Sequence, residues 1–97
     1  MCMLKKILII EDNPDLGEIF ELAFESNDFQ VQKSSEGMDG IVKAMEFQPD
    51  IILLDLMMPH VDGYEVLQGI RRHSSVPVPI IVFSNLSQQK DIDRAFE

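Results

Sequence analysis

Polar side chains whose types suit cation binding come directly after three short apolar runs of the sequence. They are Glu11 and Asp12 after residues 7–10, Asp55 after residues 51–54, and Ser84 after residues 80–83. A carboxylate at the end of a buried run is costly unless it has a partner. A partner for Asp55 is therefore expected among the side chains that the fold brings to the same place.

Three carboxylates at one place repel one another when all are ionised. A divalent cation such as Mg²⁺ removes this repulsion, because it prefers oxygen ligands, and it keeps several waters that a phosphate oxygen can replace. A carboxylate beside such an ion could act as a nucleophile toward phosphorus. Simpler alternatives are that Glu11 and Asp12 favour the N-terminus of the next helix and that Asp55 caps a turn. The joint placement at strand ends favours the metal-dependent site.

The apolar runs predict three strands that are buried on both faces. Residues 7–10, 51–54 and 80–83 are rich in Ile, Leu and Val without alternation, which is typical of a parallel sheet covered by helices. A fourth segment, residues 29–34, alternates apolar and polar side chains. Because this pattern indicates a less covered strand, we place residues 29–34 at the edge of the sheet.

Helical patterns separate the predicted strands. Asn13 is a plausible N-cap before Pro14, Asp62 with Glu65 forms an acidic variant of a capping box, and Ser87 is expected to cap a fourth helix. A further helix is predicted within residues 37–48. The apolar residues expected to face the core at helical spacing include Ile19, Ala23, Met45 and Tyr64.

The order of elements predicts an α/β fold with a doubly wound parallel sheet. Right-handed crossovers and the edge strand give the strand order 2-1-3-4. In such sheets, sites form beyond the carboxyl ends of the strands, where the winding reverses. For this order the reversal lies between the first and third strands. The topology therefore predicts that Glu11, Asp12 and Asp55 meet there, with Ser84 beside them.

The composition is that of one small globular domain, which we place at residues 1–97, with 45% hydrophobic and 26% charged residues. The net charge of -9 argues against direct nucleic-acid binding, which requires a basic surface. The run at residues 7–10 is too short for a signal peptide or a membrane span. The single cysteine, Cys2, fits a reducing compartment. We therefore predict a cytoplasmic protein with no membrane contact.

The stretch from Asp55 to Gly63 has the pattern D-x-x-M-P-x-x-D-G, and an acidic pair stands at the end of an earlier strand. In this combination the chain resembles the receiver domain of two-component response regulators, a CheY-like domain with the flavodoxin-like fold. The resemblance extends over all 97 residues. It implies a signalling module whose product is a conformational state, rather than an enzyme.

The resemblance also implies roles for individual residues. Asp55 matches the residue that accepts a phosphoryl group from a phosphohistidine on a sensor kinase or phosphotransfer protein. Glu11 and Asp12 match the acids that bind Mg²⁺ with Asp55 and the backbone carbonyl of Met57. Ser84 matches the switch hydroxyl that hydrogen-bonds the phosphoryl group.

The sequence departs from the family pattern in its last part. The family has a fifth strand and fifth helix, with a lysine after that strand that pairs with the phosphoryl group, and neither element is present. We therefore expect an incomplete receiver domain without an output domain. Residues 80–83 would then form an open, apolar edge that favours self-association.

Two other functions are compatible with parts of the sequence. A receiver-like interaction scaffold that takes no phosphoryl group would fit the missing lysine, although the intact acids and Ser84 count against it. Aspartate-based phosphohydrolases use D-x-D at a strand end, where the second acid protonates the leaving group. Met57 occupies that position here, so no general acid is available.

Overall fold

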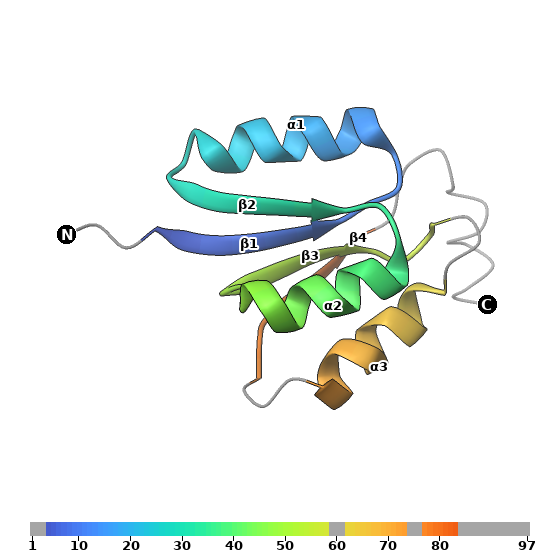
Figure 1. The fold of residues 1–97 in the computed structure, drawn as a ribbon. Coiled ribbons are helices and arrows are strands. Elements are labelled where there is room, and N and C mark those ends of the chain that lie inside the picture. The colour runs from blue at the N-terminus through green and yellow to red at the C-terminus, as the bar shows by residue number, and fades with distance from the viewer. Residues whose placement is uncertain (1–3, 59–61, 74–76, 84–97) are drawn as a thin grey trace.

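The computed structural model describes residues 4–58, 62–73 and 77–83 (Figure 1). Strands and helices alternate along this part of the chain, as the apolar runs predict. Their bounds are β1 Lys5–Ile10, α1 Pro14–Glu25, β2 Phe29–Ser34, α2 Gly37–Phe47, β3 Ile51–Asp55, α3 Gly63–His73 and β4 Ile80–Phe83. Cys2, Ser84 and the helix predicted from Ser87 lie outside the described residues.

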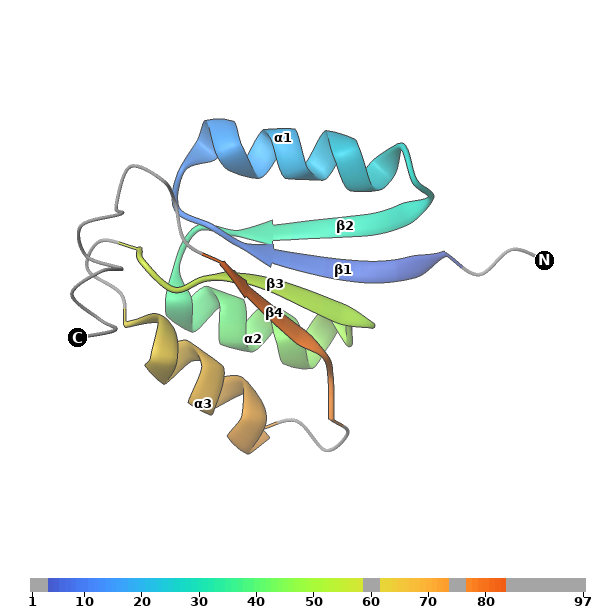
Figure 2. The same cartoon turned by 180° about the vertical axis from the view of Figure 1, so that it is seen from behind.

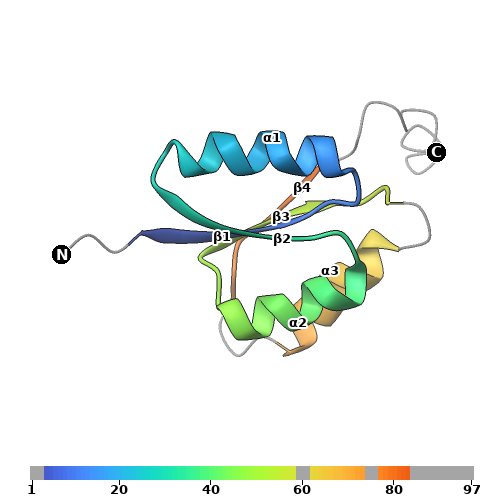
Figure 3. The same ribbon diagram turned by 45° about the horizontal axis from the view of Figure 1, so that its top comes forward.

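The strands form one parallel sheet in the order β2-β1-β3-β4, which confirms the predicted topology. Helix α1 covers one face of the sheet, and α2 and α3 cover the other (Figures 1 and 3). The view from behind shows β4 crossing in front of β3 at one side of the sheet (Figure 2). β1 and β3 lie in the middle, so their carboxyl ends are adjacent.

The core has one apolar cluster on each face of the sheet. Leu8, Ile10, Ile52 and Leu54 point toward α2 and α3, where Ile70 completes the packing. The alternate residues of the central strands point toward α1: Ile7, Ile9 and Leu53, with Phe20, Phe24, Phe29 and Phe83 packed around them. The central strands are therefore buried on both faces, which explains their unbroken apolar runs.

Side chains near the helix starts satisfy free backbone N–H groups. Asn13 Oδ1 accepts from the N–H groups of Asp15 and Leu16 at 3.0 and 3.2 Å, as predicted for an N-cap. Asp62 Oδ1 accepts from the N–H of Tyr64 at 2.9 Å. These hydrogen bonds help to fix where α1 and α3 begin.

Four of the predicted core residues are wrong. Ile19, Met45 and Tyr64 are 61%, 44% and 51% exposed, and Ala23 is also exposed. The apolar positions of these helices therefore extend beyond the face that packs in the core. Within the described part of the chain, no helix is long and apolar enough to cross a membrane.

Candidate functional site

Three acidic side chains meet at the carboxyl ends of the two central strands. Asp55 is the last residue of β3, and Glu11 directly follows β1, whose Ile10 pairs with Leu54. Glu11, Asp12 and Asp55 each offer one carboxylate oxygen, and these oxygens all lie within 4.8 Å of one another. The structure therefore brings together the acids that the topology predicts at this point.

The site is buried to an unusual degree for acidic residues. Asp55 is 0% exposed and Glu11 is 5% exposed, whereas Asp12 is half-buried. Asp55 lies at the end of its strand, as predicted, but its complete burial was not predicted. Ionised carboxylates are rarely this buried unless they are paired or bind a cation.

The hydrogen bonds of the buried carboxylates are incomplete. Asp55 Oδ1 accepts from the backbone N–H of Met57 at 2.9 Å. Asp55 Oδ2 and both oxygens of Glu11 are buried and have no hydrogen-bond partner among the described residues. Buried polar atoms are normally satisfied, and an unsatisfied anionic oxygen is especially costly. A hard cation with oxygen ligands such as Mg²⁺ fits this donor set.

The pKa of Glu11 also indicates a site suited to a cation. Burial raises the pKa of the Glu11 carboxyl to about 9, and its contact with Asp55 and the charges of Asp55 and Asp12 add to the effect. The backbone N–H of Asn13 lowers the pKa of Glu11 by a smaller amount. Without a cation, Glu11 therefore keeps a proton at neutral pH, and that proton can bridge to Asp55. A divalent cation would compete with that proton for the same oxygens.

The segment after Asp55 is held closely to the start of α3. A Cβ atom on Gly63 would lie 2.6 Å from Leu56 Cα and 2.8 Å from Leu56 O. Met58, in the same segment, is 4% exposed and packs in the core on the α3 side of the sheet. The motif from Asp55 to Gly63 therefore combines a buried acid, a core methionine and a glycine that permits close backbone packing.

Ser34, which was not among the predicted site residues, anchors Glu11 from the neighbouring strand. The backbone N–H of Glu11 donates to the carbonyl oxygen of Ser34 at 2.9 Å. Ser34 ends β2 and is 3% exposed. A buried serine at the end of a predicted strand was the available signal. The metal-ligand role of the Met57 carbonyl stays a prediction, and Ser84 lies outside the described residues.

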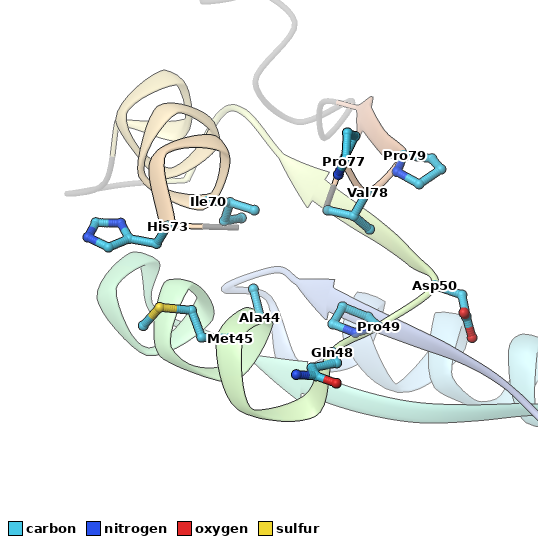
Figure 4. Close-up of a pocket in the computed structure, with 10 residues that line it drawn as sticks. All are labelled: Ala44, Met45, Gln48, Pro49, Asp50, Ile70, His73, Pro77, Val78 and Pro79. Atoms are coloured by element: carbon cyan, nitrogen blue, oxygen red, sulfur yellow. The ribbon is translucent and has the colours of Figure 1, made fainter. Parts of the chain in front are cut away.

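A cavity of about 440 Å³ lies at the opposite end of the sheet (Figure 4). It opens between α2, α3 and the segment that leads into β4. Its lining residues are Ala44, Met45, Gln48, Pro49, Asp50, Ile70, His73, Pro77, Val78 and Pro79. Asp50 and Pro79 directly precede β3 and β4. The cavity is therefore separate from the acidic site at the carboxyl ends.

Residues 7–97 match the response regulator receiver domain family. The DNA-binding dual master transcriptional regulator RpaA of Synechocystis sp. is 36% identical over 93 residues, which are 95% of this chain and 39% of that protein. The response regulator ArlR of Staphylococcus saprophyticus is 40% identical over 76 residues, which are 78% of this chain and 34% of that protein. The chain thus spans less than half the length of these curated relatives.

Solved structures agree with the sequence match. One is the receiver domain of the sensor histidine kinase PA1611 from Pseudomonas aeruginosa PAO1, which has a magnesium ion coordinated in its active site cleft. Its TM-score is 0.80 and its sequence identity is 29%, and the match covers 94% of this chain and 75% of that one. A signal receiver domain from Bermanella marisrubri has a TM-score of 0.76 and 29% identity, with coverage of 97% and 79%. By its fold, its acidic site and its sequence, the chain belongs to the response regulator receiver domain family.

Proposed function

We propose that Asp55 accepts a phosphoryl group, and that Glu11, Asp12, Asp55 and the backbone carbonyl of Met57 hold a Mg²⁺ ion beside it. The observation that carries this proposal is the group of three carboxylates within 4.8 Å, two of them buried. The magnesium ion in the cleft of the PA1611 receiver domain supports the choice of metal.

The chemistry follows from the two oxygens of Asp55. Oδ1 is held by the N–H of Met57, which fixes the orientation of the carboxylate and leaves Oδ2 to react. Oδ2 forms a bond to the phosphorus of a phosphohistidine while the phosphorus–nitrogen bond breaks. The electron pair of that bond stays on the imidazole nitrogen, which then takes a proton. Bound Mg²⁺ supplies positive charge that offsets repulsion between the acids and the phosphoryl oxygens.

Asp55 is 0% exposed, so a phosphodonor reaches Oδ2 only when the site opens locally. Asp12 is half-buried and stands on the more exposed side of the group.

The partner in this proposal is a sensor histidine kinase or a phosphotransfer protein. The receiver domain family and the histidine kinase relative support a donor of this kind. We place the reaction in the cytoplasm, which agrees with a single cysteine in 97 residues. The domain acts as a signalling module whose own phosphorylated state is the product, rather than as an enzyme that turns over separate substrates.

The test is the intact mass of the chain after incubation with acetyl phosphate and Mg²⁺. We expect one added phosphoryl group in the wild type, and none in the Asp55→Asn variant or in the wild type with EDTA. Circular dichroism of each sample establishes that the protein is folded. A folded wild type that takes no phosphoryl group would contradict the proposal and favour an interaction scaffold. Retention of the added group in the Asp55→Asn variant would place the acceptor at another residue.

A further inference from the structure

A cluster of polar side chains joins the end of β2 to the first turns of α2. We call it the β2–α2 cluster and define it as Ser34, Glu36, Asp39 and Lys43. In Figure 1 the chain leaves the arrowhead of β2 and enters α2 beside the end of β1. The cluster therefore lies next to the strand end that carries Glu11, although none of its members belongs to the acidic site.

Ser34 is the centre of this cluster. Its hydroxyl lies 2.8 Å from Asp39 Oδ2 and 2.8 Å from the carbonyl oxygen of Glu36, and accepts from the N–H of Glu36 at 3.3 Å. Lys43 Nζ contacts Asp39 Oδ2 at 3.1 Å and donates to the carbonyl oxygen of Lys33 at 2.7 Å. The Ser34 hydroxyl, together with Lys43, lowers the pKa of the Asp39 carboxyl, so Asp39 is ionised at neutral pH.

The cluster also takes the place of an ordinary helix cap. Glu36 is the N-cap residue of α2, and its side chain makes no capping hydrogen bond. The Ser34 hydroxyl instead accepts from the Glu36 N–H. This arrangement ties the start of α2 to β2, because one side chain serves both elements.

Two contacts connect the cluster to the metal-binding end of β1. The carbonyl oxygen of Ser34 accepts the backbone N–H of Glu11 at 2.9 Å. In the first turn of α2, a Cβ atom on Gly40 would lie 2.8 Å from Ile10 Cδ1, so the helix packs directly against the residue before Glu11. The position of the Glu11 backbone is therefore set by β2 and α2 rather than by β1 alone.

We infer that Ser34 and Asp39 are positioning residues for the metal site, which fix the Glu11 carboxylate through the backbone of β2. The inference rests on the proposed Mg²⁺ site. Removal of a group that orients a metal ligand without contacting the metal commonly weakens metal affinity by about tenfold or more. The alternative is that the cluster only stabilises the start of α2, in which case its removal would lower stability and leave the affinity of the folded protein unchanged.

The test compares Mg²⁺ affinity among folded variants of the chain by isothermal titration calorimetry. Ser34→Ala and Asp39→Ala remove the cluster's central bond, whereas Asp39→Asn keeps an oxygen acceptor in the same place. Asp39 is partly exposed, so its variants leave the core intact. The control is Ser26→Ala, which removes a serine hydroxyl that donates to Ala23 O at 2.9 Å at the far end of α1.

We expect Ser34→Ala and Asp39→Ala to weaken Mg²⁺ binding by about tenfold, Asp39→Asn to weaken it less, and Ser26→Ala to leave it unchanged. Wild-type affinity in both alanine variants at positions 34 and 39 would overturn the inference while the metal site stands. An equal loss in Ser26→Ala would also overturn it, because the effect would then follow stability alone. A wild type that binds no Mg²⁺ would overturn the proposed metal site, and this inference with it.

Discussion

At the scale of single residues, the fold strongly raises the pKa of the Glu11 carboxyl. Its carboxyl is 5% exposed, lies beside two other acids, and lacks a hydrogen-bond partner within the part of the chain that the structure describes. These conditions favour the protonated form when no cation is bound. The same conditions favour a cation over a proton when one is available. Glu11 therefore links the stability of the domain to pH and, in the proposed metal site, to Mg²⁺.

The first prediction concerns the pH dependence of stability in EDTA. The pKa of Glu11 is 4.5 when unfolded and about 9 when folded. Between these values the folded state binds the extra proton, so this contribution is complete below pH 4.5 and is lost as the pH rises toward 9. One group gives a slope of at most about 1.4 kcal/mol per pH unit. Urea denaturation at several pH values measures the slope.

Glu11→Gln is the control for this prediction, because it removes the titrating carboxyl and keeps a similar shape. The difference in unfolding free energy between wild type and variant should change with pH in the direction stated. Added Mg²⁺ should stabilise the wild type most at high pH, where it no longer competes with the proton. Parallel pH profiles for the wild type and Glu11→Gln, in EDTA, would show that Glu11 titrates normally.

At the scale of elements, the start of α3 is fixed by contact with the segment after Asp55. Gly63 is buried, and its Cα faces the backbone of Leu56. Gly17, in α1, is also buried, but a Cβ atom there would have Lys33 Cδ as its nearest neighbour at 3.7 Å, which is ordinary contact. The two glycines therefore differ in what the surrounding elements allow, although both lie in helices.

The second prediction compares these two glycines. Gly63→Ala should destabilise the fold by about 2 kcal/mol or more, because the methyl group would lie 2.6 Å from Leu56 Cα. A backbone atom, unlike the end of a side chain, cannot move away without shifting the chain. Gly17→Ala should stabilise it by about 0.5–1 kcal/mol, since alanine favours the helix and has room. Thermal denaturation of both variants measures the difference. Equal effects of the two substitutions would contradict the packing seen at Leu56.

At the scale of the whole molecule, the two edges of the described sheet differ in character. β2 alternates half-buried apolar residues with exposed polar ones, as its sequence predicts for an edge strand. β4 at the other edge is entirely apolar, with Ile81 51% and Val82 46% exposed. Within the described residues β4 pairs only with β3. An exposed apolar edge strand favours pairing with a further strand.

The third prediction is that this 97-residue chain self-associates through β4. Sedimentation velocity over a range of concentrations should show a concentration-dependent species larger than the monomer. Ile81→Lys places a charge on the apolar edge and should shift the equilibrium toward the monomer. Gln30→Lys, on the edge strand β2, is the matched control and should leave association unchanged. A single monomeric species at all concentrations would refute the prediction.

Much of the fold was predictable from the sequence. The apolar runs at residues 7–10 and 51–54 indicated strands buried on both faces, and the alternating segment at residues 29–34 indicated an edge strand. The same prediction for residues 80–83 is wrong, because β4 lies at the other edge of the described sheet, where Ile81 and Val82 are exposed. The errors at Ile19, Met45 and Tyr64 arose because apolar spacing along a helix does not show which of its apolar residues reach the sheet. That choice depends on the angle and depth at which each helix packs.

The meeting of Glu11, Asp12 and Asp55 follows from the sequence, because strand order and strand ends follow from local patterns and the rules of parallel sheets. The complete burial of Asp55, the raised pKa of Glu11 at about 9 and the contact of Glu11 with Ser34 emerge only from the folded arrangement. Burial, pKa and anchoring depend on atoms that separate elements bring within a few ångströms. Residue spacing along the chain does not specify those distances.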